Sequence, residues 1–178
     1  MDFSGELTEA HKEEMEKHAG FNQGHIVEHY DDVAANYEDI YLRAGFPDPR
    51  KCADLARNNA KLFNRPISEL EVFDMGCGSG LVGSYLYEDG FRNITGCDAS
   101  PGMLAECERR RPGVHKELVE LFLGKPDTFP AHLRNKFDIV TGSGIFADNH
   151  LDNKGFDEML LCLKPGGIAC FATRTEYL

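Results

Sequence analysis

The stretch VFDMGCGSG, at residues 72–80, decides the fold class of this 178-residue chain. It joins a short apolar strand, predicted at residues 70–74, to glycines at positions 76, 78 and 80. The apolar positions 81, 82, 85 and 86 then predict a helix that ends near Gly90. Alternate glycines let the backbone turn sharply and approach a ligand without Cβ clashes. A strand, a glycine loop and a helix in this order predict a ligand site at the carboxyl end of the strand.

The sequence that follows continues to alternate strands with helices. Further strands are predicted at residues 94–97, 115–123, 137–140 and 168–173, and helices at residues 100–110 and 153–163. At residues 115–123 periodicity alone leaves a helix open as the alternative. Ser100 and Pro101 are a start signal for the first of these helices, an N-cap followed by proline in the first turn. This alternation predicts an α/β fold with a Rossmann-like, doubly wound sheet that is mainly parallel.

The part of the chain before the first strand reads as helical. Helices are predicted at residues 6–18 and 25–44, and a third begins at Pro49 and ends before Pro66. We therefore expect a single domain over residues 1–178, with a helical N-terminal cap at residues 1–65 and an α/β core at residues 66–178.

The charge and the cysteine content argue against several classes of protein. The formal net charge is −11, from 30 acidic and 19 basic residues, and it disfavours DNA or RNA as a bulk partner. The basic run Arg109–Arg111 is interpreted as a helix C-terminus rather than as a nucleic-acid patch. The six cysteines have no C-x-x-C spacing, so we expect reduced thiols and no bound metal.

The sequence indicates neither membrane insertion nor export. No apolar run approaches the ~20 residues that span a membrane. The N-terminus lacks the basic start and apolar stretch of a signal peptide. We expect a cytoplasmic protein without membrane contact, with the nucleus as the alternative location.

Asp98, at the end of the second strand, indicates the class of ligand. It is placed to accept hydrogen bonds from ribose hydroxyls, while the helix behind the glycine loop offers unpaired amides to an anion. The site is therefore predicted to bind a nucleoside. Residues 78–83, GSGLVG, also satisfy the dinucleotide fingerprint, so this pattern leaves NAD open. Asp74 favours an amino-acid cofactor, because a carboxylate there suits an α-ammonium group better than a pyrophosphate.

Four segments in order resemble the motifs of class I S-adenosylmethionine-dependent methyltransferases. They are residues 72–80 (VFDMGCGSG), 98–104 (DASPGML), 137–140 (FDIV) and 163–167 (LKPGG). Residues 80–83, 100–104 and 173–175 are similar to the methyltransferase-like members of that class, and residues 30–37 to a helix that caps the cofactor. The resemblance implies S-adenosylmethionine as the cofactor and S-adenosylhomocysteine as its product.

The resemblance also implies roles for particular residues. Asp74 and the glycine-loop backbone would face the methionine moiety, and Asp98 the ribose. Met103 would border the adenine and Tyr37 would close over the cofactor, although packing within the core remains an alternative for both side chains. The predicted cofactor-binding residues are Tyr37, Asp74, Gly76, Cys77, Gly78, Gly80, Asp98, Ala99, Met103, Gly124 and Ser143.

Two features depart from the family pattern. Residues 123–126, LGKP, stand where the family often has an acidic residue near the adenine amino group, so only the backbone of Gly124 is expected to contact the adenine there. Strands six and seven of the family have no counterpart before Leu178. A fifth strand with an unpaired edge exposes hydrogen-bonding groups, which predicts self-association through that edge unless another segment covers it.

The methyl acceptor is not encoded in any pattern of the sequence. Transfer needs an acceptor held in line with the activated methyl group, and a base where the acceptor is a hydroxyl or a protonated amine. Asp148, Asn149 and His150 are candidates, with His25 and His29 on the cap, but no residue is assigned as catalytic. A helical cap favours a small-molecule acceptor over a protein side chain. A cofactor-binding module without turnover and a dinucleotide-dependent oxidoreductase remain as alternatives.

Overall fold

The computed structural model describes residues 23–43, 45–146 and 150–173, so the helix predicted at residues 6–18 lies outside the described residues. The helices are α2 (Ile26–Arg43), α3 (Asp48–Asn59), α4 (Leu81–Glu88), α5 (Pro101–Arg110) and α6 (Lys154–Cys162). The strands are β1 (Glu71–Met75), β2 (Asn93–Asp98), β3 (Glu117–Glu120), β4 (Phe137–Ser143) and β5 (Leu163–Ala172). Short 3₁₀ turns lie at Gln23–His25, Ala60–Phe63, Ile67–Glu69, Pro126–Thr128 and Ala131–Leu133.

The five strands form one sheet in the order β3-β2-β1-β4-β5, and every neighbouring pair is parallel. The chain builds β1, β2 and β3 outward on one side, then crosses back to place β4 on the other side of β1. Strand order therefore reverses between β1 and β4, where open α/β sheets bind their ligands. The predicted Rossmann-like, doubly wound fold is confirmed.

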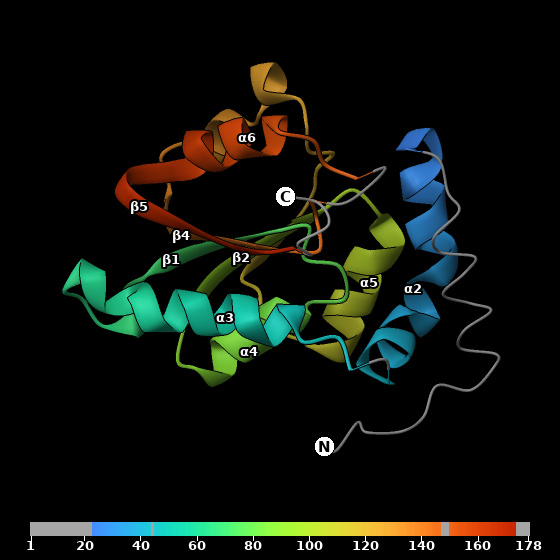
Figure 1. Cartoon of the computed structure of the whole chain (residues 1–178), viewed down its shortest axis with the longest axis horizontal. Helices are drawn as coiled ribbons and strands as arrows, with labels where there is room; N and C mark the ends of the chain where they lie inside the picture. Colours follow the sequence, from blue (N-terminus) through green and yellow to red (C-terminus); the bar gives the residue numbers. More distant parts are fainter. Residues whose placement is uncertain (1–22, 44, 147–149, 174–178) are drawn as a thin grey trace.

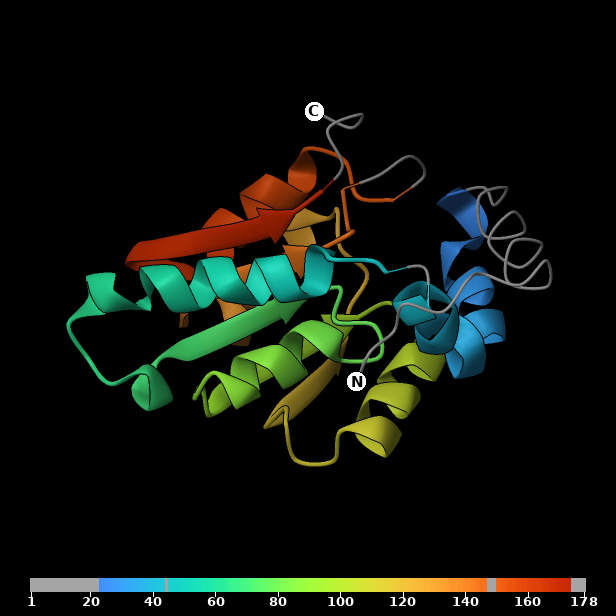
Figure 2. The ribbon, with the colours of Figure 1, turned by 60° about the horizontal axis from the view of Figure 1, so that its bottom comes forward.

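Helices cover both faces of the sheet, with α3 and α4 on one face and α6 on the other (Figures 1 and 2). Alternate strand residues belong to different layers, as the pleat requires. Val72 and Ile139 pack with the buried side chains of α3 and α4, whereas Phe73 and Val140 pack with those of α6. Burial on both faces explains why the strands read as apolar runs.

The predicted strand boundaries differ most from the structure in β3 and β5, and β4 continues three residues beyond its predicted end, to Ser143. The third strand, predicted at residues 115–123, is confined to Glu117–Glu120. Leu121 to Leu123 leave the sheet and line a pocket instead, so their apolar character serves the pocket wall. The turn at residues 164–167 lies inside β5 as an irregularity, since Phe137 pairs with Leu163 but Ile139 pairs with Ile168.

The N-terminal helices have different positions. α3 packs on the sheet through its buried residues Cys52, Ala53 and Ala56. α2 instead lies beside α5, next to the end of the sheet (Figure 1). The division into cap and core at residue 65 stays a prediction. Within the described ranges, no helix is both long enough and apolar enough to cross a membrane.

Candidate functional site

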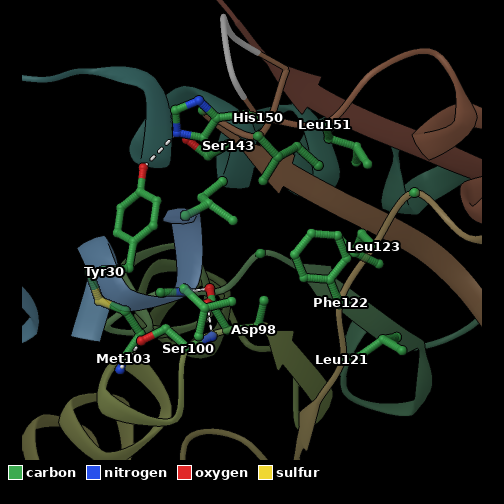
Figure 3. Close-up of a pocket in the computed structure, with 18 of the residues that line it drawn as sticks. Tyr30, Asp98, Ser100, Met103, Leu121, Phe122, Leu123, Ser143, His150 and Leu151 are labelled. Atoms are coloured by element: carbon green, nitrogen blue, oxygen red, sulfur yellow. Dashed lines mark hydrogen bonds between the residues drawn. The ribbon is translucent and has the colours of Figure 1, made fainter. Parts of the chain in front are cut away.

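A pocket of about 300 Å³ lies between α2 and the carboxyl ends of the strands (Figure 3). Its walls come from α2 and from the segments that follow β1, β2, β3 and β4. The volume is at the lower end of the range found for small-molecule sites. Eight of the predicted cofactor-binding residues line it, namely Tyr37, Gly76, Gly78, Asp98, Ala99, Met103, Gly124 and Ser143.

The glycine loop after β1 forms the floor of this pocket. Gly76 has a φ of +64°, a left-handed conformation that side chains rarely adopt. A Cβ atom at this position would also lie 2.4 Å from Cγ2 of Ile145. The sequence therefore requires glycine at position 76 for two independent reasons, and the bare backbone is open to a ligand.

Asp98 is held in place by backbone donors. Its Oδ1 accepts a hydrogen bond from the Ser100 amide (3.0 Å) and its Oδ2 one from the Gly78 amide (2.9 Å). Burial raises the pKa of Asp98, and the backbone donors oppose that rise. Each carboxylate oxygen has a second acceptor site, so Asp98 can also receive hydrogen bonds from ligand hydroxyls.

Another part of the pocket lining is apolar. Met103 lies near Asp98, and Leu121, Phe122 and Leu123 line the far side of the cavity (Figure 3). Such a slot suits a flat ring such as adenine.

Glu158 on α6 fixes the loop that continues from this wall. Its Oε2 accepts from the Gly124 amide (2.7 Å) and its Oε1 from the Lys125 amide (2.8 Å). Burial raises the pKa of Glu158, against the effect of these two donors. The sequence prediction missed Glu158, although an acidic side chain inside the apolar run of α6 was a visible signal.

Asp74, Cys77 and Gly80 belong to the predicted set but do not line the pocket. Asp74 is buried behind the glycine loop, where its Oδ1 accepts from Oγ1 of Thr141 (2.8 Å). Its Oδ2 lies 3.6 Å from Nε2 of the buried His115. Burial lowers the pKa of His115, but the neighbouring Asp74 and Cys107 outweigh it and raise that pKa to about 9. Asp74 therefore lies against His115 inside the protein, and its predicted contact with the cofactor stays a prediction.

Two tyrosines of α2 close the pocket from the cap side. The rings of Tyr30 and Tyr37 meet edge to face, with centroids 5.8 Å apart. Oη of Tyr30 lies 2.6 Å from Nε2 of His150, which links α2 to the segment after β4 (Figure 3). Burial raises the pKa of both tyrosines, so their hydroxyls stay protonated.

The other candidate acceptor-side residues have different positions. Asp148 and Asn149 lie outside the described residues. His25 is exposed, and the ring of His29 packs against Tyr30, with centroids 5.2 Å apart. Burial lowers the pKa of His29. Of the predicted histidines, His150 is therefore the one that lines the pocket.

These observations define the class of the site. A carboxylate at the end of β2, an open glycine backbone after β1 and an apolar slot after β3 fit the ribose, the polar tail and the base of an adenosyl cofactor. The chain is a Rossmann-like α/β protein whose pocket has the lining of a nucleoside site.

Comparison with known proteins identifies the family. Residues 72–167 match the family model described as a methyltransferase domain. The chain is 32% identical over 147 residues to methyltransferase-like protein 27 of Homo sapiens, which covers 83% of this chain and 57% of that protein. It is 31% identical over 149 residues to a demethylmenaquinone methyltransferase of Beutenbergia cavernae, covering 81% of this chain and 57% of the relative. The chain therefore belongs to the class I S-adenosylmethionine-dependent methyltransferases, as its motifs predicted.

Solved structures agree with this assignment. An amino pentose methyltransferase from Micromonospora echinaspora, solved with S-adenosylmethionine bound, is 26% identical with a TM-score of 0.58. The match covers 76% of this chain and 54% of that enzyme. The chain spans just over half the length of the curated relatives that it matches.

Proposed function

We propose that this pocket binds S-adenosylmethionine and that the protein transfers its methyl group to a small-molecule acceptor. The observation that carries the proposal is the convergence of the predicted residues. Eight positions predicted from the sequence, spread from Tyr37 to Ser143, line one pocket. Distant positions selected by separate motifs meet in this way only if the motifs describe one site.

The proposed contacts follow from the walls of the pocket. Asp98 accepts from the ribose hydroxyls, and Met103 and Leu121 enclose the adenine. The backbone at Gly76 and Gly78 receives the methionine moiety. The cofactor supplies an activated methyl group when bound, and the protein contributes orientation and the exclusion of water.

The acceptor end of the pocket is proposed to lie at Tyr30 and His150. These side chains occupy the cap side, across the cavity from Leu121, Phe122 and Leu123 (Figure 3). A hydroxyl acceptor bound there would give its proton to Nδ1 of His150, while Nε2–H of the same ring donates to Oη of Tyr30 (2.6 Å) and is oriented by it. A pocket closed by α2 favours a small acceptor over a protein chain.

Calorimetric titration tests the cofactor. We expect S-adenosylmethionine and S-adenosylhomocysteine to bind the wild type and NAD not to bind it. Asp98→Ala should weaken the binding of both adenosyl ligands by at least about tenfold. Asp127→Ala, at an exposed aspartate that does not line the pocket, is the matched control and should bind as the wild type does. Binding of NAD alone would establish the oxidoreductase alternative and refute the proposal.

Turnover separates the enzyme from a silent binding module. The wild type, loaded with S-adenosylmethionine, is incubated with matched hydroxyl and amine compounds, and S-adenosylhomocysteine is measured. Product formation that depends on His150 for hydroxyls but not for neutral amines supports the acceptor site proposed here. Tight cofactor binding without product from any acceptor favours the silent module.

A further inference from the structure

Asp31 on α2 caps the first turn of a different helix, α5. Its Oδ1 accepts hydrogen bonds from Oγ of Ser100 (2.5 Å) and from the Gly102 amide (2.8 Å). A Cβ atom at Gly102 would lie 2.9 Å from that oxygen, so the contact depends on glycine. A negative charge near a helix N-terminus is favourable. Here that charge belongs to Asp31 of α2, a neighbouring helix, rather than to a residue of α5.

The hydrogen bonds of Asp31 continue into the cofactor site. The Ser100 amide donates to Oδ1 of Asp98 (3.0 Å), and the Gly78 amide donates to Oδ2 of the same carboxylate (2.9 Å). An unbroken series of hydrogen-bonded residues thus runs from Asp31 through Ser100 and Asp98 to the glycine loop.

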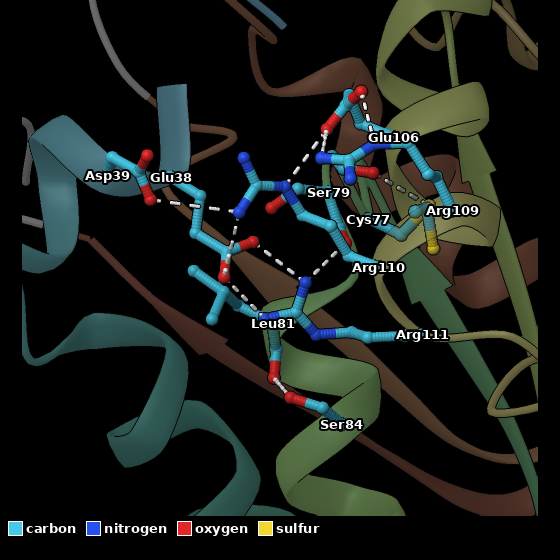
Figure 4. A network of polar contacts seen from close by, with 12 residues as sticks. Glu38, Asp39, Cys77, Ser79, Leu81, Ser84, Glu106, Arg109, Arg110 and Arg111 are labelled. Carbon is cyan, nitrogen blue, oxygen red and sulfur yellow. Dashed lines mark hydrogen bonds and ion pairs between the residues drawn. The ribbon is translucent and has the colours of Figure 1, made fainter. Parts of the chain in front are cut away.

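Glu38, about two helical turns further along α2, begins a second series. Its buried carboxylate accepts from both terminal nitrogens of Arg111, at 2.7 Å each. Nη1 of Arg111 also donates to the carbonyl oxygen of Ser79 in the glycine loop (2.9 Å) (Figure 4). Burial raises the pKa of Glu38, but the hydrogen bonds from Arg111 outweigh it and lower that pKa, so the pair is charged.

Arg110 provides a comparison on the same helix. It donates to the carbonyl oxygen of Ala35 (2.9 Å) and to Glu106 (2.9 Å), which joins α5 to α2. These partners belong to helices, whereas Arg111 adds a bond to the glycine loop. Nη1 of Arg110 also lies 3.9 Å from Glu38 and 3.7 Å from Asp39, looser pairs than the 2.7 Å contacts of Arg111 with Glu38. A variant of Arg110 therefore loosens the docking of α2 without removing a bond to the glycine loop.

We propose that Asp31, Glu38 and Arg111 are positioning residues, through which α2 holds the glycine loop at Gly78 and Ser79 in its cofactor-binding conformation. The inference rests on the proposed function, because it assigns these residues to the same site. Docking of α2 and binding of the cofactor are then coupled, and each strengthens the other by the same factor. α2 is part of the binding site rather than a lid that moves independently of the loop.

Calorimetry with S-adenosylhomocysteine on Arg111→Gln and Arg110→Gln tests the proposal. Both variants lose a charge at the C-terminal end of α5, and thermal unfolding is used to check that each is folded. We expect Arg111→Gln to bind about tenfold more weakly than the wild type, and Arg110→Gln within about twofold of it. Glu38→Gln loosens α2 from Arg111, and Gly102→Ala loosens Asp31 of α2 from the first turn of α5. Both should also weaken binding, and they replace Arg111→Gln if that variant does not fold.

Hydrogen exchange supplies a readout that a purely structural role would not change. S-adenosylhomocysteine should slow amide exchange in residues 31–38 of the wild type and of Arg110→Gln, and much less in Arg111→Gln at saturating ligand. Equal affinities and equal protection in Arg111→Gln and the wild type would overturn the inference alone. Absence of binding to the wild type would overturn the proposed function and, with it, this inference.

Discussion

Asp138, at the start of β4, ties three segments together through one carboxylate. Its Oδ2 accepts from the Glu71 amide (2.9 Å), and its oxygens pair with Arg65 (2.6 Å) and Lys164 (3.1 Å). Burial raises the pKa of Asp138, but these three donors outweigh it and lower that pKa below the ordinary 3.8. The charged form is therefore the form that stabilises the fold.

We predict that Asp138→Asn lowers the free energy of unfolding by about 1–3 kcal/mol at neutral pH, since the amide pairs poorly with two cations. The contribution of a carboxylate with a lowered pKa is complete above its ordinary pKa and is lost as the pH falls through the folded value. Urea unfolding at neutral and acidic pH should therefore show the two proteins converging in acid. A difference that stays constant with pH would refute this account.

The pKa of the Cys107 thiol is lowered, whereas the pKa of each of the other buried cysteines is raised. A hydrogen bond from Cys77 and the contact of its Sγ with Nδ1 of His115 (3.4 Å) outweigh burial and lower its pKa to about 6. Burial raises the pKa of Cys52 to about 12. The microenvironment, rather than the residue type, therefore decides which thiol is ionised.

We predict one thiolate at neutral pH, on Cys107. Ultraviolet thiolate absorbance of the folded protein should titrate with a midpoint near 6, and this step should be absent in Cys107→Ser. Cys52→Ser is the control and should keep it. Loss of the step in the control would place the thiolate elsewhere.

At the scale of elements, α6 fixes part of the pocket wall. Glu158 is the link, because its two oxygens receive both amides of the loop at Gly124 and Lys125. An amide side chain can accept only one of these hydrogen bonds and sets its NH₂ group against the other donor.

We therefore predict that Glu158→Gln loosens this loop and weakens the binding of S-adenosylhomocysteine about three- to tenfold. This is the effect of one poorly paired buried donor. The measurement is calorimetric affinity, with Asp157→Asn on the exposed side of α6 as the control. Equal losses in both variants would show a general effect of charge on α6 rather than a specific one on the loop.

Elements whose signals are local could be predicted from the sequence. Ser100 was predicted as an N-cap, and its side chain accepts from the Met103 amide (3.0 Å). The third strand was predicted too long, because the apolar run continues into the pocket wall after the chain has left the sheet. Periodicity measures burial, and it does not distinguish a sheet from a cavity as the place of burial.

The residues of the pocket and its supports divide in the same way, into those with a local signal in the sequence and those without one. Strand-end residues such as Gly76, Asp98 and Ser143 could be predicted, because the carboxyl ends of parallel strands meet at one edge. Asp31, Arg111 and Glu158 were not predicted as parts of it, since their partners lie far away in the sequence and no local pattern specifies such contacts.

At the scale of the whole molecule, β5 forms one edge of the described sheet. Its exposed residue Ala169 sits on a strand whose outer side has no partner among the described strands. Edges of this kind are sites of pairing between chains, and natural proteins protect them with charge.

We predict concentration-dependent self-association of this chain through β5, and a reduction of it in Ala169→Lys. Light scattering over a range of protein concentrations measures both, and Ser68→Lys, at an exposed position away from the edge, controls for the added charge. A monodisperse monomer at all concentrations would show that the edge is protected.

The central position of β1 has a consequence for synthesis on the ribosome. β1 pairs with β2, which emerges soon after it, but also with β4, which emerges only after β3 and two further turns. Until then the nascent chain exposes one side of β1, including the ring of Phe73 that later stacks on Phe137. A partly synthesised chain of this kind exposes apolar surface and is prone to aggregate. Translation that stalls before Phe137 should therefore recruit chaperones more strongly than translation that stalls after β4.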